Sequence, residues 1–572
     1  MSYNEQNVNT MKRKPQVIDF FCGAGGFSEG FRQQGFDVVM GIDNWAPAIE
    51  THNLNHNLND RVKDVLDFGT SIDEINNLPN TEVIVGSPPC VLFSLSNKGG
   101  KADKTLGLKL IESFLRVVAV KKHQPSSKLV AWFMENVPNS KNFLSPTYTF
   151  RQLNLEEWAK SHKIDPDQIA LKGSENGHVL NTANFGTSQK RERFVCGELV
   201  SSGNFPSLER FMTKEFRGIG TVKEKMPSPE MGVSKNIYVD PNYPSLKFVA
   251  HKITDHFYDT GIYENQWKKA RDLKINHPFM GKMSFPEDER NPSRTIMATR
   301  SLTSRETLIY KSEYKRKGDG EYRLPTIREI ATLMGFPYSY QFYGGENTKW
   351  RQVGNAVCPP MSSALAKSVR LSLKLPIIAD SKIEFVSSNE TSNKFENLNT
   401  FAKKKFDTPP KKKPTARFRA HPFKDGNMTV ALTNFNPSKS SELQNQLVEW
   451  HSSVFLGSGK DFIIKAIPKN KFKQIAKLIE SHHDVKGKKF VIEFDKKFRR
   501  HIGNSDKFQE AYVSGLKSDL FEPGQLIDEI GKFILHYEPE EKYMKMSNFI
   551  PEKEQVPTKQ VLAMYAINRI VS

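Results

Sequence analysis

The chain has 572 residues, of which 37% are hydrophobic and 26% are charged, a composition typical of a globular protein with two or three domains. No apolar run approaches the ~20 residues that span a bilayer, and the polar N-terminus has no apolar stretch of the signal-peptide type, so we expect no membrane partner. The four cysteines lie far apart, which argues against a disulfide framework or a zinc ribbon and favours a reduced, cytoplasmic protein.

The net charge of +19 favours a polyanionic partner. Residues 401–500 alone contain 23 Lys and Arg against 9 Asp and Glu, an excess of 14 positive charges. Residues 1–400 carry an excess of only 8. The basic charge is therefore concentrated in the last third of the chain.

Residues 16–200 predict an α/β fold in which strands and helices alternate. The expected strands are Gln16–Phe21, Asp37–Ile42, Glu82–Gly86 and Leu129–Met134, and the expected helices are Phe27–Gln34 and Leu106–Val120. Strands separated by helices indicate a parallel sheet with helices on both faces. Ligands of such sheets bind beyond the carboxyl ends of the strands.

The pattern changes after residue 200. Residues 200–290 are rich in Pro, Gly, Asn and Lys and predict irregular structure, and apolar periodicity resumes over Ser293–Tyr310. Two helices are expected next, around Thr326–Met334 and from Pro360 to about Leu373.

A second region of regular structure is expected from Met428 onward. We predict strands over Met428–Phe435, Asp461–Ile467 and Lys489–Asp495, helices over Glu442–Phe455 and Lys471–Ser481, and mostly helix thereafter. The predicted division of the whole chain is a core (16–199), an irregular region (200–290), a return to the core (291–375), a linker with basic clusters (376–415) and an accessory α/β domain (416–572).

A glycine cluster follows the first expected strand, in the run Asp19-Phe20-Phe21-Cys22-Gly23-Ala24-Gly25-Gly26-Phe27-Ser28. Glycines in this position let the backbone turn tightly and approach a ligand closely. Asp43 ends the next strand, where a carboxylate can accept hydrogen bonds from ribose hydroxyls. Asp64 is the next acidic residue of interest after Asp19 and Asp43, and it lies in the stretch before the following strand. The alternative is a structural turn with surface carboxylates, but the three features in order favour a nucleoside cofactor.

Cys90 ends the run Val83-Ile84-Val85-Gly86-Ser87-Pro88-Pro89-Cys90. A cysteine just past a strand and preceded by two prolines is held rigidly at the ligand edge of the sheet. An isolated cysteine is more often an inert buried side chain, so this run alone does not identify a nucleophile.

Two further motifs favour a catalytic Cys90 over an inert one. Met134-Glu135-Asn136-Val137-Pro138 places a carboxyl group at the end of another expected strand, where burial raises its pKa and lets it donate a proton near neutral pH. Gln189-Lys190-Arg191-Glu192-Arg193-Phe194 leads basic residues into an apolar strand. Taken singly, the first motif could be a surface carboxylate and the second a solvated charge run.

In this order and at these spacings the motifs resemble the cytosine-5 DNA methyltransferases of bacterial restriction–modification systems. The resemblance continues with Ser293-Arg294-Thr295-Ile296 and Gly354-Asn355-Ala356-Val357, and it covers residues 16–375. It implies a Rossmann-like S-adenosylmethionine-dependent core, with double-stranded DNA as the partner and a monomeric enzyme acting beside a separately encoded restriction endonuclease.

The resemblance also implies roles for individual residues. Phe21 would stack on the adenine of S-adenosylmethionine, Asp43 would hold its ribose, and Asp64 would hold its adenine amino group. The remaining implied cofactor contacts are Gly23, Ala24, Gly25, Gly26, Val65, Pro89, Asn355 and Ala356.

The implied chemistry explains the catalytic residue types. A Cys90 thiolate adding to C6 of cytosine makes C5 nucleophilic, and Glu135 offsets the charge that builds at N3. Arg193 would contact the cytosine O2, and Arg191 would support the site electrostatically. Because C6 is inaccessible within a duplex, the base must be flipped out. The sequence assigns no residue to removing the C5 proton.

Two positions depart from the family pattern. Val91 follows the nucleophile where the family usually has Gln, which puts that position's contact in doubt. Asn44, rather than an aromatic residue, follows Asp43, and Trp45 comes one position later.

The irregular region lies where the family carries its target-recognition segment, and its basic side chains are expected mainly to contact phosphates. These are Lys214, Arg217, Lys223, Lys225, Lys247, Lys252, Lys268, Lys269 and Arg271. Bidentate contacts to guanine or adenine would read the target sequence, but the sequence does not show which residues make them.

Other functions remain open at this point. One is a fused nuclease in which Glu493, Asp495 and Lys497 end a strand, although acid-x-acid-x-Lys runs are common by chance, and an extra DNA- or partner-binding domain is the favoured interpretation. Another is an RNA cytosine methyltransferase acting on tRNA. A third is a DNA-binding protein without catalysis, which the retention of Cys90 and Glu135 argues against.

Overall fold

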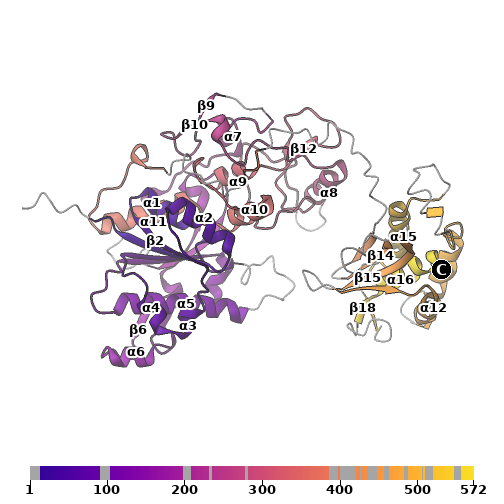
Figure 1. Cartoon of the computed structure of the whole chain (residues 1–572), viewed down its shortest axis with the longest axis horizontal. Coiled ribbons are helices and arrows are strands. Elements are labelled where there is room, and N and C mark those ends of the chain that lie inside the picture. Colours follow the sequence, from indigo (N-terminus) through magenta and orange to yellow (C-terminus); the bar gives the residue numbers. More distant parts are fainter. Residues whose placement is uncertain are drawn as a thin grey trace, which may run out of the picture. The chain divides into compact units, whose positions relative to one another are not determined.

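The computed structural model divides into two compact units, Met1–Thr408 and Pro409–Ser572, which are taken separately below (Figure 1). The structure describes residues 13–90, 104–197, 208–230, 235–276, 281–385, 397–399, 420–425, 428–435, 447–456, 463–481, 487–504, 507–508, 520–540, 542–545 and 555–572. Among these, no helix is both long and apolar enough to cross a bilayer.

The N-terminal unit is built on a six-stranded sheet in the order β2-β1-β3-β4-β8-β7. Its strands are β1 (Gln16–Phe20), β2 (Asp37–Ile42), β3 (Val83–Gly86), β4 (Ala131–Asn136), β7 (Gly177–Asn181) and β8 (Glu192–Gly197). β2, β1, β3 and β4 are parallel, but β8 runs antiparallel to both β4 and β7. The expected wholly parallel sheet is therefore wrong at this edge. β7 and β8 are joined by a short connection, which can link only antiparallel neighbours.

Side chains of the central strands alternate between two cores because successive residues of a strand point to opposite faces. Val17, Val85 and Phe133 pack with α1 (Gly26–Gln33) and α11 (Pro359–Ser372). Ile18, Ile84 and Trp132 pack on the other face with α5 (Lys104–His123). Figure 1 shows these helices covering opposite faces of the sheet. The predicted layers are confirmed.

The expected helices of the core occur within a few residues of their predicted bounds. α11 begins at Pro359, a favoured first residue because it needs no donor there. α9 (Ile327–Leu333) begins with a reciprocal cap in which Thr326 and Glu329 each accept the other's backbone N–H. α1, α5, α9 and α11 therefore follow from local sequence signals.

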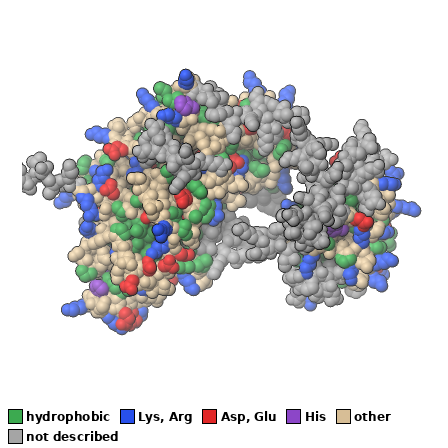
Figure 2. Space-filling view, in the orientation of Figure 1, with side chains coloured by type: hydrophobic (Ala, Val, Ile, Leu, Met, Phe, Trp, Pro, Cys, Tyr) green, Lys and Arg blue, Asp and Glu red, His purple; other side chains and the backbone are tan. Residues whose placement is uncertain are grey.

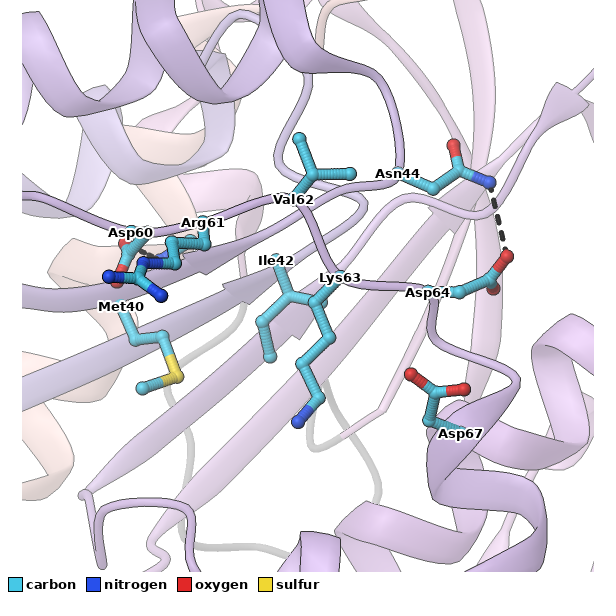
Figure 3. A pocket seen from close by; sticks show the side chains of 10 residues that line it. Met40, Ile42, Asn44, Asp60, Arg61, Val62, Lys63, Asp64 and Asp67 are labelled. Atoms are coloured by element: carbon cyan, nitrogen blue, oxygen red, sulfur yellow. Dashed lines mark hydrogen bonds between the residues drawn. The ribbon is translucent and has the colours of Figure 1, made fainter.

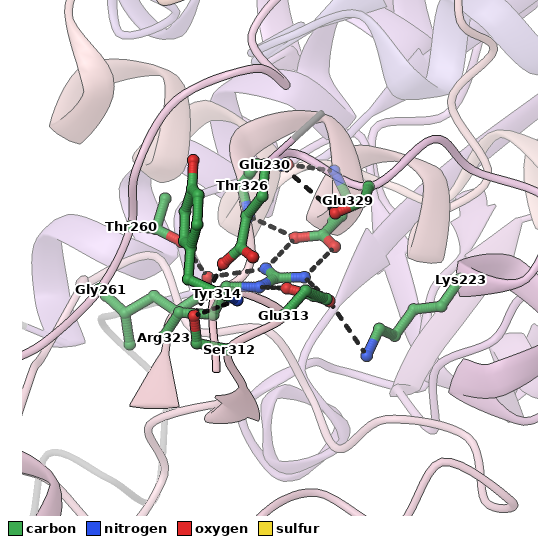
Figure 4. Close-up of polar contacts among 12 residues, drawn as sticks. Lys223, Glu230, Thr260, Gly261, Ser312, Glu313, Tyr314, Arg323, Thr326 and Glu329 are labelled. Atoms are coloured by element: carbon green, nitrogen blue, oxygen red, sulfur yellow. Dashed lines mark hydrogen bonds and ion pairs between the residues drawn. The ribbon is translucent and has the colours of Figure 1, made fainter. Parts of the chain in front are cut away.

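The helices and strands among the described residues of 208–323 are short, and buried ion pairs hold them together. These elements are α7 (Ile219–Lys223), β9 (Ile237–Val239), β10 (Lys247–Val249), α8 (Glu264–Ile275), β11 (Tyr310–Lys311) and β12 (Tyr322–Arg323). The fully buried Arg323 guanidinium binds Glu313 and Glu329 at 2.7–2.8 Å (Figure 4). The periodicity expected over 293–310 yields regular structure only at β11.

The C-terminal unit has its own hydrophobic core and an antiparallel sheet in the order β13-β14-β15-β16. The strands are β13 (Ala420–Asp425), β14 (Met428–Phe435), β15 (Leu447–Leu456) and β16 (Ile463–Ile467). Its main helices are α12 (Phe472–Ser481), α13 (Gly487–Lys497), α15 (Pro523–Tyr537) and α16 (Thr558–Val571).

Two predictions in this unit are wrong. The helix expected over Glu442–Phe455 is strand β15 where it is described, because Trp450, Val454 and Leu456 alternate into the core and the strand pairs on both sides. The strand expected over Lys489–Asp495 is helix α13, because its buried side chains, Phe490 and Phe494, recur at helical spacing.

Candidate active site

Cys90 lies at the end of the turn that follows β3, and hydrogen bonds tie this turn to both neighbouring strands. The Ser87 hydroxyl donates to the Phe21 carbonyl oxygen at 3.0 Å. The Asn136 side-chain amide donates to the Pro88 carbonyl oxygen at 3.1 Å. The thiol is thus fixed between the glycine turn after β1 and the end of β4. Val91 lies outside the described residues.

The surroundings of Cys90 shift the pKa of its thiol in opposite directions. Burial, and then the Glu135 carboxylate, raise the pKa of the Cys90 thiol, while Arg193 and Arg191 oppose that rise. The protonated thiol is therefore the resting form near neutral pH. The three charged groups that influence the thiol are those that the sequence analysis placed beside it.

Glu135 and Arg193 form a buried ion pair where β4 ends and β8 begins. The Arg193 Nε lies 2.9 Å from the Glu135 Oε1, and the two side chains are only 9% and 2% exposed. Burial raises the pKa of the Glu135 carboxyl, and the two arginines only partly offset this. The site therefore holds a carboxyl group whose pKa is raised above its usual range, next to a cation.

Arg191 is also buried, but its donors point to backbone carbonyls. Its guanidinium donates to the carbonyl oxygens of Ile296 (3.3 Å), Gly354 (3.0 Å) and Ala356 (3.1 Å). Burial and the neighbouring Arg193 lower its pKa to about 10. These contacts join β8 to the segment at the end of α10 (Glu346–Asn355).

The turn after β1 has the backbone geometry expected of a ligand-binding loop. Phe21, Gly23 and Gly25 all have positive φ, at 53°, 52° and 79°. A Cβ on Gly23 would meet nothing closer than 3.9 Å, so the space above it is open. Ala24 is buried, and its carbonyl oxygen accepts a 2.5 Å hydrogen bond from Tyr340.

Gly26 closes the turn against the C-terminal part of the unit. A Cβ at this position would lie 2.0 Å from the Val357 carbonyl oxygen, so only glycine fits. Gly30, one turn later in α1, is equally close to α11. This contact brings Asn355 and Ala356 to the glycine turn, with Asn355 exposed and Ala356 buried.

Asp43 is anchored directly beside the turn. It accepts hydrogen bonds from the backbone N–H groups of Gly23 (3.0 Å) and Trp45 (2.8 Å). Burial raises the pKa of its carboxyl, and these two donors partly counter the rise. Each carboxylate oxygen keeps further acceptor capacity for a hydroxyl group.

Asp64 lines an open hollow of about 600 Å³ at the outer edge of β2 (Figure 3). Asp64 and Asp67 lie at one end of it, and Asp60 and Arg61 lie at the other. The Asn44 amide donates to Asp64 at 3.4 Å. Asp64 is the only one of the predicted cofactor residues that lines the described hollow. Val65 beside it is buried.

Pro89 and Trp45 complete the predicted positions. Pro89 is exposed next to Cys90, while Pro88 before it is buried. The Arg351 guanidinium stacks on the Trp45 ring, with its Cζ 4.5 Å from the ring centroid. The tryptophan that departs from the family spacing therefore packs against α10.

Two positioning residues escaped the sequence analysis. Asn136 tethers the Cys90 turn, and Tyr340 supports the glycine turn from behind. Asn136 directly follows Glu135, so its adjacency to a candidate acid was an available signal. Tyr340 lies more than 300 residues from Ala24, and no local pattern marks that contact.

The proposed nuclease motif does not form. Glu493 and Asp495 lie on helix α13, and Asp495 is held by Arg569 at 2.9 Å. Among the described residues no group of three or more His, Cys, Asp or Glu side chains could hold a metal ion. The expected placement of Glu493, Asp495 and Lys497 at the end of a strand is therefore wrong.

A known protein family matches the part of the chain that contains the candidate site. Residues 15–370 match the family model of the C-5 cytosine-specific DNA methylases. The chain is 28% identical over 364 residues to the Type II methyltransferase M.AplI of Arthrospira platensis, covering 63% of this chain and 86% of the relative. It is 26% identical over 371 residues to the Type II methyltransferase M.HgiDI of Herpetosiphon aurantiacus, covering 63% and 96%.

Solved structures also match the chain. The S. pombe Dnmt2 methyltransferase is 17% identical, with a TM-score of 0.40, and covers 63% of this chain and 100% of its own. Family membership rests on the family model, which spans more than half of the chain and contains the whole candidate site. The chain belongs to the C-5 cytosine-specific DNA methylase family and is a DNA cytosine-5 methyltransferase.

Proposed function

We propose that this methyltransferase is sequence-specific, that it modifies a cytosine flipped out of duplex DNA, and that it belongs to a restriction–modification system. The observation that carries the mechanism is the grouping of the Cys90 thiol with the Glu135 and Arg193 ion pair. The named Type II relatives support the restriction–modification role.

In the proposed mechanism, the Cys90 thiol loses its proton to solvent, and the resulting thiolate forms a bond to C6 of the cytosine. The ring electrons move toward N3, where the protonated Glu135 donates its proton, and C5 becomes nucleophilic. S-adenosylmethionine, when bound, would supply the methyl group that C5 takes and would be left as S-adenosylhomocysteine. Loss of the C5 proton to solvent, return of the N3 proton to Glu135 and departure of the Cys90 sulfur as a thiolate then restore the ring. The rise in the Glu135 pKa supports its role as the proton donor.

We assign different tasks to the two arginines. Arg193, in contact with Glu135, is placed to hold the cytosine O2. Arg191 is a positioning residue, because both of its terminal nitrogens already donate to the carbonyl oxygens of Ile296, Gly354 and Ala356. Replacing Arg191 would therefore release the backbone carbonyl groups that it holds, which lie on the side of the site where we place the cofactor.

The residues present fit S-adenosylmethionine. Phe21 would pack on the adenine, Asp43 would accept hydrogen bonds from the ribose, and Asp64 would accept one from the adenine amino group. The open space over Gly23 leaves room for the methionine part. The walls would be completed by Ala24, Gly25, Gly26, Val65, Pro89, Asn355 and Ala356.

Incubation with tritiated S-adenosylmethionine and either plasmid DNA or bulk tRNA tests the substrate. We expect label in DNA and none with the Cys90→Ser variant, whose hydroxyl is a far weaker nucleophile. The variant should still bind DNA. Label in tRNA alone would contradict the proposal, and wild-type turnover by Cys90→Ser would exclude Cys90 as the nucleophile.

Bisulfite sequencing of DNA from a host that expresses the gene tests sequence specificity. Methylated cytosines should share one short sequence context, and scattered methylation would contradict specificity. DNA modified in this way should resist a separately encoded endonuclease that cuts unmodified DNA at the same sequence. Light scattering should give a monomer mass near 65.2 kDa.

A further inference from the structure

Helix α13 in the C-terminal unit has two faces of opposite character. Phe490 and Phe494, followed by Phe498 just past the helix, are at most 1% exposed and pack in the core. The other face carries the exposed side chains of Lys488, Lys489 and Lys496, and the exposed Arg499 and Arg500 follow in the turn just past the helix. Ile492 lies among them and is 68% exposed. Figure 2 shows Lys and Arg side chains on the visible surface of this unit.

The two carboxylates of α13 do little to neutralise these cations. Asp495 accepts hydrogen bonds from Tyr565 (3.0 Å) and from Arg569 (2.9 Å). Glu493 accepts one from the Tyr537 hydroxyl, and Lys489 lies 3.7 Å from it. Both acids lie on the flanks of the helix and point to neighbouring elements. For Lys488, Lys496, Arg499 and Arg500, the described residues offer no salt-bridge partner.

Such a surface costs stability in isolation. Lys496, Arg499 and Arg500 are close together in the sequence, and like charges that lie near one another repel. An exposed isoleucine among cations adds apolar surface that water does not favour. A polyanionic partner removes the repulsion and covers the isoleucine.

We propose that the exposed face of α13 binds the phosphate backbone of duplex DNA and adds sequence-independent affinity to the methyltransferase. Lys488 and Lys496 lie about 12 Å apart along the helix axis, at 1.5 Å per residue, and Arg499 and Arg500 extend the cationic surface past the helix end, so that it reaches several successive phosphates. Phosphate contacts of this kind position a protein on DNA without reading its sequence. The inference rests on DNA as the substrate, but it does not depend on the proposed catalytic mechanism.

The test is the salt dependence of DNA binding by the full chain. The variant combines Lys488→Gln, Lys496→Gln and Arg499→Gln, and binding to a fluorescent 40-base-pair duplex of arbitrary sequence is followed by anisotropy across NaCl concentrations. We expect at least a tenfold loss of affinity at low salt. The slope of log K against log salt should fall by about 0.9 for each lost phosphate contact.

A matched control removes the same charge elsewhere in the unit, through Lys424→Gln, Lys532→Gln and Lys545→Gln, all exposed side chains. Both triple variants should keep a cooperative unfolding transition, because the replaced side chains are exposed and belong to no core. An unchanged slope in the α13 variant, or equal losses in both variants, would overturn the proposal. So would binding to an acidic protein while the DNA slope stays the same.

A second measurement needs no variant. Acetylation of lysines in the wild-type chain, read by mass spectrometry, should be slower at Lys488 and Lys496 when duplex DNA is present and unchanged at Lys424. Equal acetylation with and without DNA would also contradict the proposal. Because neither readout requires methyl transfer, failure here is distinguishable from failure of the catalytic proposal.

Discussion

At the residue scale, the thiol of Cys90 and the carboxyl of Glu135 influence each other's protonation. The Glu135 carboxylate contributes to the raised pKa of Cys90, after burial, and the arginines reduce both shifts. Replacing either group therefore changes the charge state of the other. Reactivity of the thiol and turnover of the enzyme should then respond differently to the same substitution.

Glu135→Gln should make Cys90 more reactive and the enzyme slower. Removing the carboxylate lowers the Cys90 pKa, and each unit of lowering increases the thiolate fraction about tenfold below the pKa. Alkylation by iodoacetamide at pH 8 should therefore be several-fold faster. Methyl transfer should fall, though less completely than in Cys90→Ser, because an amide can still hydrogen-bond the ring.

The controls for this experiment are in the chain. Cys22, Cys196 and Cys358 are buried, and burial raises their pKa values, so Cys90→Ser should remove nearly all fast alkylation. If Glu135→Gln slows alkylation and methyl transfer together, the electrostatic coupling is wrong.

At the element scale, the approach of α1 to α11 fixes the glycine turn. Gly26 contacts backbone, whereas Gly23 faces open space. The two glycines therefore perform different tasks although they lie three residues apart. One permits helix packing, and the other leaves room for a ligand.

Gly26→Ala should destabilise the N-terminal unit by about 3 kcal/mol, the upper range for overpacking, because a backbone oxygen lies 2.0 Å from the new Cβ. Gly23→Ala should cost roughly 1–2 kcal/mol from its positive φ. It should nevertheless weaken S-adenosylmethionine binding. Thermal unfolding and calorimetric titration separate the two effects, and equal unfolding losses would contradict the assignment.

Glu230, which lies beside the ion pairs of Figure 4, should make the stability of the folded protein depend on pH. Burial raises the pKa of Glu230 to about 7, and its partner Ser312 donates a 2.7 Å hydrogen bond. A raised carboxyl pKa means that the folded state holds its proton more tightly than the unfolded state. Stability contributed by this group is therefore present below about pH 4.5 and is lost as the pH rises to 7.

Glu230→Gln should accordingly raise the unfolding temperature relative to wild type at pH 8, and the gain should shrink toward pH 5. The exposed Glu224→Gln on the same segment should show no such trend. A gain that grows toward low pH would mean that the sign of the Glu230 shift is wrong.

Some elements could be predicted from the sequence, and others could not. β1, β2 and α11 follow from apolar spacing, glycine and proline, because these signals are local. α13 was predicted as a strand because Val491, Ile492 and Phe494 favour strands, and only the burial of Phe490 and Phe494 on one face reveals the helix. At the site, residue types and order placed Cys90, Glu135 and Arg193 together. The Arg191 contacts arise from tertiary packing, which no local pattern records.

At the scale of the whole molecule, each unit has hydrophobic clusters of its own among its described residues. The clusters of the N-terminal unit use residues up to 398, and that of the C-terminal unit begins at Phe423. All candidate site residues and the family match lie in the N-terminal unit.

A chain truncated after Thr408 should therefore fold and methylate DNA. Its affinity for arbitrary duplex DNA should fall, with a smaller salt slope, because α13 is absent. Circular dichroism and methyl-transfer assays check the first expectation, and anisotropy checks the second. A truncated chain without a cooperative unfolding transition would show that the units depend on each other.

The contact between Gly26 and Val357 has a consequence for protein synthesis. The glycine turn leaves the ribosome early, but the backbone that completes it is made more than three hundred residues later. At 5–20 residues per second, this delay is roughly 15–65 s. During that time the apolar side of α1 has no α11 to cover it. A nascent chain interrupted before Val357 should therefore have no finished cofactor pocket, and such fragments should depend on chaperones.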